Sequence, residues 1–350
     1  MREGLEIAGA RGEGGGQILR TSLALSIITG RPIAMRRIRA GRAKPGLRRQ
    51  HLTCVEAAAQ LCNATTQGAK VGSQELEFTP GPIAAADLTI DIGTAGSTSL
   101  VVQTILVPAI LAKSTLRITV IGGTHNPMAP PFDYLERVFL PHLRAMGAEL
   151  SMTLDRHGFA TGGGRRDSHD DETPERGQLT VTIGPGALRP IEIVESGPIT
   201  SRHATAILAR LPTHVGEREL AIIQQRLGFT PAECEIRDVR ASAPANVLLI
   251  EVERTTGREL VTAFGEKGLR AELVAERACD ELGEFLAANV PVGDHLADQL
   301  LLPMAVAGGG RFRARPLSLH ATTNINTIRM FLEVPIRVEA VGDASVVTVG

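Results

Sequence analysis

The sequence predicts a mixed α/β or α+β protein made of several units, because short β-branched stretches alternate with helical segments along the chain. This alternation also recurs: one β-α-β-α series covers residues 5–62 and a second covers residues 87–146. A third observation is size, since 350 residues with 43% hydrophobic content can bury a large core and suggest about two domains.

Hydrophobic periodicity and turn residues place the elements of both series. In the first series we expect strands at residues 5–8 and 33–38 and helices at residues 15–28 and 47–62. In the second series we expect strands at residues 87–92 and 116–121 and helices at residues 97–111 and 132–146. Paired strands are expected after each series, and the polar stretch at residues 162–177 is interpreted as an exposed loop.

A self-contained block follows the turn Gly184-Pro185-Gly186. Its expected elements are strands at residues 191–194, 247–252 and 260–264 and helices at residues 204–211 and 217–225. We interpret residues 185–275 as an inserted small domain and residues 1–184 with 276–350 as the large domain. A helix at residues 271–288 is expected to return the chain to the large domain.

Composition excludes several classes of protein. The longest apolar stretches, such as residues 101–112 around Pro108, fall short of the roughly 18 residues of a membrane span. The N-terminal residues carry acids where a signal peptide has a basic and then an apolar run, so we expect a cytoplasmic location. The 4 cysteines are widely spaced without a C-x-x-C pair, which favours core residues over a zinc site or disulfides.

The net charge of -1 conceals a basic run without any acidic residue between Arg31 and Arg49. The basic residues are Arg31, Arg36, Arg37, Arg39, Arg42, Lys44, Arg48 and Arg49. A solvated face remains an alternative, but unrelieved arginines favour a polyanionic partner, since the guanidinium group suits phosphate contacts. Aromatic residues make up only 3%, so any nucleic acid is expected to be held by its end and its phosphates rather than by base stacking.

A glycine cluster, Gly12-Glu13-Gly14-Gly15-Gly16-Gln17-Ile18-Leu19-Arg20, separates the first expected strand from the first helix. Glycines permit close backbone approach, and N–H groups at a helix start attract phosphate oxygens. Glu13, Gln17 and Arg20 fall on one side of this helix start. The cluster therefore predicts an anion site, although a tight turn with incidental polar neighbours is the alternative. It is not a Walker loop, because no G-x-x-x-x-G-K-[ST] occurs.

Three further segments are candidates. The helix start Gly93-Thr94-Ala95-Gly96-Ser97-Thr98-Ser99 is either a second phosphate contact or an ordinary N-cap. The segment from Gly122 to Pro131 is expected to form a rigid loop after a strand, where ligands often dock. His320 lies where a strand is expected to pass into a helix, and a neutral imidazole can act as a nucleophile. A lone histidine is more often structural.

Together these segments resemble the RNA 3'-terminal phosphate cyclase family, in one order from about residue 5 to the C-terminal strands. The segments that carry the resemblance are the glycine cluster at 12–20, Ile38-Arg39-Ala40-Gly41-Arg42-Ala43-Lys44-Pro45-Gly46-Leu47, Gln50-His51-Leu52, Gly122-Gly123-Thr124, Ala129-Pro130-Pro131, His157-Gly158-Phe159 through Gly164, Leu296-Ala297-Asp298-Gln299-Leu300, and His320 with Thr323-Asn324.

The resemblance implies a fold and a reaction. The fold is a large domain of three repeated βαβαββ-type units, interrupted by a smaller inserted α/β domain. The reaction uses ATP and a divalent metal, Mg or Mn, to convert an RNA 3'-phosphate into a 2',3'-cyclic phosphate. His320 would attack the α-phosphate of ATP, the AMP would pass to the RNA 3'-phosphate, and the neighbouring 2'-hydroxyl would then expel AMP. No obligate protein partner is expected.

The resemblance also implies roles for individual residues. Glu13 would hold the metal near the ATP phosphates. The residues that would bind nucleotide phosphates or the RNA end are Gln17, Arg20, Arg39, Arg42 and Gln50. The residues that would line the nucleotide site are Gln103, Asp298 and Gln299. Pro130 would cover one face of the adenine, and His295, at a position that is often tyrosine in the family, would stack on the other.

Three other interpretations are considered. A catalytically inactive relative that serves ribosome assembly would lack the nucleophilic histidine, whereas His320, Glu13 and Arg20 are all present here. An enolpyruvyl transferase shares related repeat units but handles small anionic metabolites, and the arginine-rich run and inserted domain favour an RNA end instead. A purely structural α/β protein is the third alternative.

Overall fold

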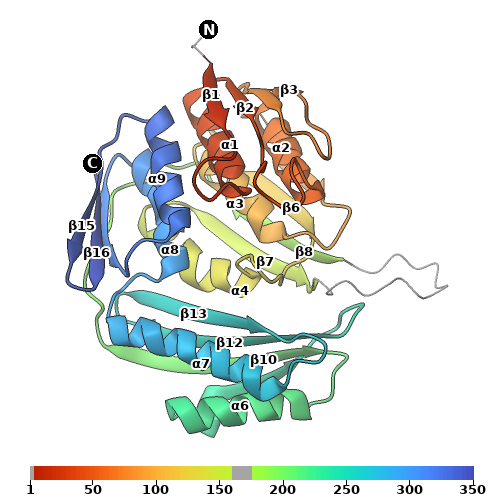
Figure 1. Ribbon diagram of the computed structural model, residues 1–350, viewed down its shortest axis with the longest axis vertical. Helices are drawn as coiled ribbons and strands as arrows, with labels where there is room; N and C mark the ends of the chain where they lie inside the picture. Colours follow the sequence, from red (N-terminus) through yellow and green to blue (C-terminus); the bar gives the residue numbers. More distant parts are fainter. Residues whose placement is uncertain (1–3, 85, 160–175) are drawn as a thin grey trace, which may run out of the picture.

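The computed structural model describes residues 4–84, 86–159 and 176–350. These residues form four sheets of four strands each, and three of the sheets share one topology. In each of the three, the first two strands are parallel and are joined by a helix, and the last two strands pair antiparallel. The expected large body of three βαβαββ units, with a smaller α/β insertion, is therefore confirmed (Figure 1).

The first unit has the strand order β1-β2-β4-β3. Its elements are β1 (Leu5–Ala8), α1 (Gln17–Thr29), β2 (Ile33–Arg36), α2 (Arg49–Cys62), β3 (Thr65–Gln67) and β4 (Leu76–Thr79). Helix α1 forms because its apolar residues are buried almost all round, and it ends at Gly30, which adopts the left-handed conformation of a C-cap.

The second unit has the strand order β5-β6-β8-β7. Its elements are β5 (Asp87–Asp91), α3 (Thr98–Ile110), β6 (Leu116–Gly122), α4 (Phe132–Tyr134), the π-helical turn η1 (Leu135–Phe139), α5 (Leu140–Ala145), β7 (Leu150–Arg156) and β8 (Gly177–Ile183). The single helix expected at 132–146 is thus interrupted by a π-turn. Most of the loop expected at 162–177 lies outside the described residues, and Gly177 already begins β8.

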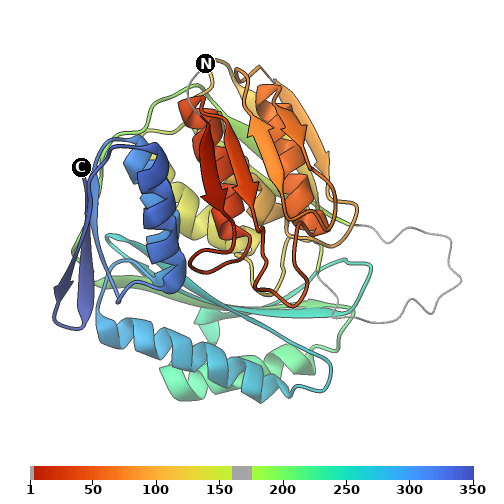
Figure 2. The same cartoon turned by 45° about the horizontal axis from the view of Figure 1, so that its top comes forward.

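The third unit has the strand order β9-β14-β16-β15. Its elements are β9 (Glu192–Ile193), α8 (Asp294–Val306), β14 (Gly310–Ala314), α9 (Leu319–Phe331), β15 (Ile336–Val341) and β16 (Ala344–Val349). The inserted unit separates β9 from α8 in the sequence. One hydrophobic core runs through all three units, and α1 packs against both α3 and α9 (Figures 1 and 2).

The inserted unit has the strand order β11-β10-β12-β13. Its elements are β10 (Ile199–Ala209), α6 (His214–Leu227), the 3-10 turn η2 (Pro231–Glu233), β11 (Cys234–Asp238), β12 (Ala245–Arg254), β13 (Gly257–Phe264) and α7 (Ala271–Ala288). Helices α6 and α7 cover one face of its sheet around a second core, while residues of the opposite face join the large core (Figure 1).

The structure corrects one expected element. Residues 204–211 were expected to be helical, yet residues 204–209 belong to strand β10. The alanines there favour a helix in isolation, but β10 lies between β11 and β12 with both faces covered, so tertiary packing decides the conformation. Small residues are required because α6 approaches closely, and a Cβ on Gly216 would lie 3.0 Å from the Cβ of Ala206.

Packing also shifts the limits of the inserted unit. The boundary expected at residue 275 falls inside α7, whose buried face from Val274 to Phe285 belongs to the second core. At the other end, β9 follows the expected boundary at residue 185 but pairs with β14 of the third unit. Helix α7 therefore packs with the small sheet before the chain returns to the large body. In the described residues, no helix combines the length and the apolar content needed to cross a membrane.

Candidate active site

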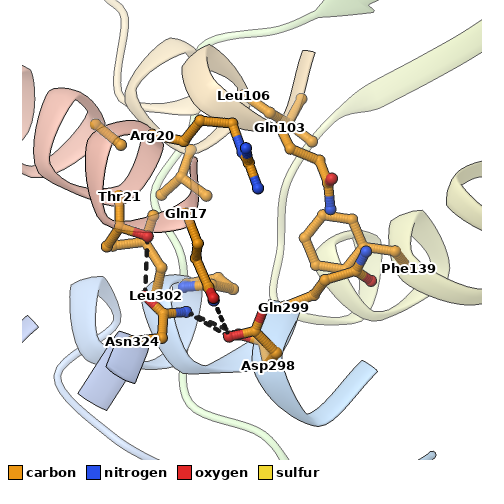
Figure 3. Close-up of a pocket in the computed structure, with 13 residues that line it drawn as sticks. Gln17, Arg20, Thr21, Gln103, Leu106, Phe139, Asp298, Gln299, Leu302 and Asn324 are labelled. Carbon is orange, nitrogen blue, oxygen red and sulfur yellow. Dashed lines mark hydrogen bonds between the residues drawn. The ribbon is translucent and has the colours of Figure 1, made fainter. Parts of the chain in front are cut away.

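Segments far apart in the chain converge at a pocket between α1, α3 and α8, beside the start of α9 (Figure 3). Gln17, Arg20 and Thr21 come from α1, Gln103 from α3 and Asp298 from α8. Gln299 and Asn324 also line the pocket. Five residues predicted from the family resemblance thus meet at one place: Gln17, Arg20, Gln103, Asp298 and Gln299.

The glycine turn before α1 has a backbone shape that favours glycine. Gly12 has a φ of 60° and Gly14 a φ of 65°, in the left-handed region that other residues avoid. A Cβ on Gly12 would lie 2.3 Å from Oγ1 of Thr323, so the turn sits directly against α9. The same hydroxyl accepts a hydrogen bond from the Glu13 N–H at 3.0 Å. The first unit and the third unit are therefore joined at this turn.

His320 lies in the first turn of α9, which Ser318 caps by accepting a hydrogen bond from the Ala321 N–H at 3.2 Å. The His320 side chain is exposed, and its Nδ1 lies 2.7 Å from Oε1 of Gln17. Gln17 in turn donates from Nε2 to Oδ1 of Asp298 at 2.6 Å. The imidazole is thus held at one nitrogen by a buried chain of hydrogen bonds and is open at the other.

These hydrogen bonds determine which nitrogen of the neutral His320 ring carries the proton. Oδ1 of Asp298 accepts hydrogen bonds from Gln17 and, at 3.0 Å, from Nδ2 of Asn324, so the Gln17 amide must present its NH₂ to Asp298 and its oxygen to His320. An oxygen can only accept, so Nδ1 of His320 carries the proton. The lone pair of the neutral ring then lies on Nε2, the nitrogen that a ligand can reach.

Asp298 is the half-buried centre of this network. Burial raises the pKa of its carboxyl, and the Asn324 hydrogen bond, the nearby His320 and the Gln17 hydrogen bond oppose the rise. Asn324 is itself oriented by Thr21, whose hydroxyl donates to Oδ1 of Asn324 at 2.9 Å. These hydrogen bonds therefore hold the side chains of Gln17, Asp298 and Asn324 in one arrangement, as a preorganised site requires.

Two basic side chains flank the start of α1. A Cβ on Gly16 would lie 2.5 Å from Nε2 of His51 and 2.7 Å from Nη1 of Arg20, so both nitrogens converge on this glycine. Burial, together with the charges of Arg39, Arg20 and Arg48, lowers the pKa of His51 to about 3. His51 is therefore neutral at pH 7, and because its Nδ1 accepts the Arg48 N–H at 3.1 Å, its proton lies on Nε2.

Glu13 lies at the rim of the same turn. Its Oε2 accepts the Gly15 N–H at 2.7 Å, and its Oε1 forms an ion pair with Arg42. Arg42 also donates to the Glu13 carbonyl oxygen at 3.0 Å. Arg42 thus reaches the glycine turn, whereas Arg39 is turned into its own loop, where Nη1 donates to the carbonyl oxygens of Lys44 and Gly46 at 2.8 and 2.9 Å.

The remaining predicted residues lie in two groups. Oε1 of Gln50 accepts the Ser97 N–H at 3.1 Å, which ties α2 to the start of α3, and the Ser97 hydroxyl caps that helix. Pro130 and His295 lie outside the pocket lining. His295 is exposed and meets the edge of the Tyr134 ring with a centroid distance of 6.2 Å.

The loop expected to be rigid, Gly122 to Pro131, is anchored by buried groups. His125 lies 2.9 Å from Oγ1 of Thr124 through Nδ1 and 2.8 Å from Oδ2 of Asp133 through Nε2. Arg137 holds the other oxygen of Asp133 at 3.0 Å. Both His125 and Asp133 are inaccessible to a ligand, which indicates that they support the loop that carries Pro130.

Sequence reasoning assigned no role to several residues that the structure brings to the site, chiefly His51, Thr323, Asn324 and Thr21. The first three lie within segments that carried the resemblance, but their partners are more than 30 residues away in the chain. Thr21 could have been identified from the sequence, because it follows Arg20 on the helix that the glycine cluster begins.

Comparison with known proteins agrees with this geometry. The family model described as RNA 3'-terminal phosphate cyclase matches residues 11–338. The chain is similar to proteins named RNA 3'-terminal phosphate cyclase from Ectopseudomonas mendocina (47% identity over 95% of this chain and 94% of the relative) and Koribacter versatilis (44% identity over 94% and 90%). A third, from Ralstonia nicotianae, is 44% identical over 99% and 96%. The chain therefore belongs to the RNA 3'-terminal phosphate cyclase family.

Proposed function

We propose that this protein is an ATP-dependent enzyme that converts an RNA 3'-terminal phosphate into a 2',3'-cyclic phosphodiester, with His320 as the nucleophile. Membership of the family supports the overall reaction. The observation that carries the mechanism is the chain His320–Gln17–Asp298, which holds the imidazole with its reactive nitrogen open. The alternative of a catalytically inactive binding protein is not favoured, because His320, Gln17 and Asp298 are all present and joined by hydrogen bonds.

In the first step, Nε2 of His320 attacks the α-phosphorus of ATP. The P–N bond forms, the bond to the pyrophosphate oxygen breaks, and pyrophosphate leaves. The ring gains positive charge as it loses its lone pair, and the Nδ1 proton already faces Oε1 of Gln17, where the charge is stabilised. Arg20, which lines the pocket, and the N–H groups at the start of α1 would face the phosphate oxygens of a bound ATP.

In the second step, an oxygen of the RNA 3'-phosphate attacks the histidine-bound phosphorus, and the P–N bond breaks. The lone pair returns to Nε2, so His320 is regenerated. In the third step, the 2'-hydroxyl attacks the 3'-phosphorus and loses its proton, and AMP departs. The AMP supplies a good leaving group that a bare phosphate monoester lacks, which is why the reaction requires activation.

The donor set near the glycine turn fits one divalent cation bound largely through ATP. In the described part of the chain no group of three or more His, Cys, Asp or Glu could hold a metal by itself. Mg²⁺ is commonly held by one or two carboxylates together with substrate phosphates. Glu13 would supply that carboxylate once Arg42 moves from it, and the cation would neutralise charge on the phosphates.

The pocket provides the surroundings for a nucleotide. Gln103, Asp298 and Gln299 would line it, and Oε1 of Gln299 is buried without a hydrogen-bond partner among the described residues. A buried, unpaired amide oxygen is costly, so it favours a ligand with an N–H donor such as an adenine amino group. We assign the adenine faces to Pro130 and His295, and the phosphates or RNA end to Arg39, Arg42 and Gln50.

Covalent labelling tests the mechanism. The wild type, incubated with ATP labelled at the α-phosphate and with Mg²⁺ or Mn²⁺, is expected to retain label that acid releases and alkali does not, as for a P–N bond. His320→Ala is expected to retain none. His214→Ala is the matched control, because His214 is exposed on the distant helix α6 and should label normally. Equal labelling of wild type and His320→Ala would overturn the assignment of the nucleophile.

A further inference from the structure

The inserted unit places a buried carboxyl group at the start of α8. Glu259 lies on β13 with only 8% of its surface exposed, and its side chain packs against Gly293, the N-cap of α8. A Cβ on Gly293 would lie 2.0 Å from Oε2 of Glu259 and 3.0 Å from Oε1. The carboxyl group fills the space that a side chain at position 293 would take, so such a side chain would force Glu259 to move.

This contact lies close to the nucleotide pocket along the helix. Helix α8 begins at Asp294, and the pocket residues Asp298 and Gln299 follow within its second turn. Asp298 accepts the hydrogen bonds that orient Gln17 and Asn324, so a shift of α8 changes the support of His320. The start of α8 is thus packed against a buried group of the inserted unit, and this packing limits how far the helix start can move.

Acidic groups on the neighbouring elements make the charge of Glu259 costly. Burial raises the pKa of Glu259 to about 8, Glu281 on α7 and Asp294 on α8 add to the rise, and the N–H groups of Leu260 and Gly293 oppose it. On the side of the large body, burial raises the pKa of the Tyr134 phenol on α4, and the charge of Glu259 adds to that rise. The carboxyl group is therefore mostly protonated at neutral pH.

We propose that Glu259 is a positioning residue through which the inserted unit fixes the start of α8 and, with it, Asp298 and Gln299. The inserted unit then contributes to ATP affinity without touching the nucleotide. This inference rests on the proposed function for its effect on ATP, but the placement of α8 can be measured without any nucleotide.

Hydrogen–deuterium exchange tests that placement. In Glu259→Ala, the backbone amides at residues 294–299 are expected to exchange about five-fold faster, because the lost side chain leaves space beside Gly293 and costs roughly 1 kcal/mol of local packing. Glu253→Ala is the matched control, because Glu253 lies on the adjacent strand of the same sheet but pairs with Ser201 and Arg258 at the surface. Unchanged exchange at 294–299 in Glu259→Ala would overturn the inference whatever the enzyme's reaction proves to be.

A second arm uses a variant that keeps the shape of the site. Glu259→Gln is neutral at every pH, so exchange at residues 294–299, corrected for the intrinsic rate, should not change between pH 7 and pH 9. In the wild type it should rise over this range as Glu259 ionises near pH 8. The dissociation constant of a non-hydrolysable ATP analogue should rise several-fold in parallel, in the wild type only. Identical pH profiles of the two proteins would also overturn the inference.

Discussion

At the scale of single residues, the site depends on the direction of one amide. The Gln17 amide would orient His320 wrongly if its oxygen and nitrogen exchanged places, and only its contact with Asp298 prevents that exchange. The partners of Gln17 are 281 and 303 residues away in the sequence. Gln17 therefore has a positioning role beside the phosphate role that the family resemblance implied.

This role predicts the effect of two substitutions. Gln17→Ala removes the acceptor that holds the Nδ1 proton of His320, so the rate of adenylylation at saturating ATP should fall about 100-fold, as when a catalytic ring loses its orienting partner. Asp298→Asn can still offer an oxygen to Gln17, so its rate should fall less. Single-turnover labelling measures both rates. A rate in Gln17→Ala equal to that of the wild type would contradict the role.

The arginines of the basic run between Arg31 and Arg49 differ in the groups that they contact. Arg42 reaches the glycine turn, whereas Arg36 is engaged by Glu75 and Glu77 at the surface. Arg42→Ala should weaken binding of an RNA 3'-phosphate end about 10- to 100-fold, the value of a charge-assisted hydrogen bond. Arg36→Ala should change it less than about five-fold. Fluorescence anisotropy at one salt concentration measures both, and equal losses would show that the run acts only as a diffuse charge.

At the scale of elements, the glycine turn owes its shape to two separate constraints. Gly12 combines a left-handed backbone with contact to Thr323, whereas Gly30 has a similar backbone with no atom within 4 Å of an added Cβ. Gly12→Ala should therefore lower the free energy of unfolding by about 2–4 kcal/mol, from backbone strain and overlap together. Gly30→Ala should cost only about 1–2 kcal/mol. Urea unfolding compares the two, and equal costs would mean that α9 yields to the added methyl group.

The elements that local pattern predicted correctly are those whose burial matches their periodicity. Helices α1, α2 and α3 and strands β1, β5 and β6 appear within two or three residues of the expected limits. Strand β10 was mistaken for a helix because its alanine-rich half is buried on both faces, which removes the alternation that marks a strand. The limits of the inserted unit were displaced because α7 buries its apolar stripe in the second core, which no local pattern reveals.

From the sequence, the site could be predicted only as a set of separate segments, without the contacts between them. The glycine cluster, His320 and the residues Asp298 and Gln299 carry chemistry that sequence can flag, and the structure brings them together. The sequence could not show that Arg42 pairs with Glu13 or that His51 faces Arg20, since these contacts depend on how the first loop folds back on α1. The positions of Pro130 and His295 relative to adenine stay predictions.

At the scale of the whole molecule, three units of one topology place their helices together, and the site forms where helices of all three meet. Helix α1 comes from the first unit, α3 from the second, and α8 and α9 from the third. No single unit holds the site. The proposed nucleophile His320 and the residues that orient it can therefore meet only after the whole large body has assembled, so we expect activity to depend on global folding.

Buried titratable groups also act on the whole molecule. Burial lowers the pKa of His51 to about 3 and of His142 and His157 to about 4, so these rings oppose protonation in the folded state. Their contribution to stability is present above pH 6.5 and is lost as pH falls toward 4 and 3. Burial raises the pKa of Glu219 to about 7 and of Glu259 to about 8. Their contribution is present below pH 4.5 and is lost as pH rises through 7 and 8.

These opposite signs predict a stability maximum near pH 6.5. Of these five groups, the two glutamates alone act between pH 6.5 and 8, and each lowers the free energy of unfolding by up to about 1.4 kcal/mol per pH unit until its own pKa is reached. Between pH 4.5 and 6.5 the three histidines outweigh these two glutamates slightly, and below pH 4.5 the opposing contribution of the two glutamates ends, so the loss steepens. Urea unfolding from pH 4 to 9 measures this curve.

The double variant Glu219→Gln with Glu259→Gln should flatten the alkaline side of the stability curve and leave the decline below pH 4.5 in place. An alkaline side as steep as that of the wild type would show that other groups cause the loss of stability there.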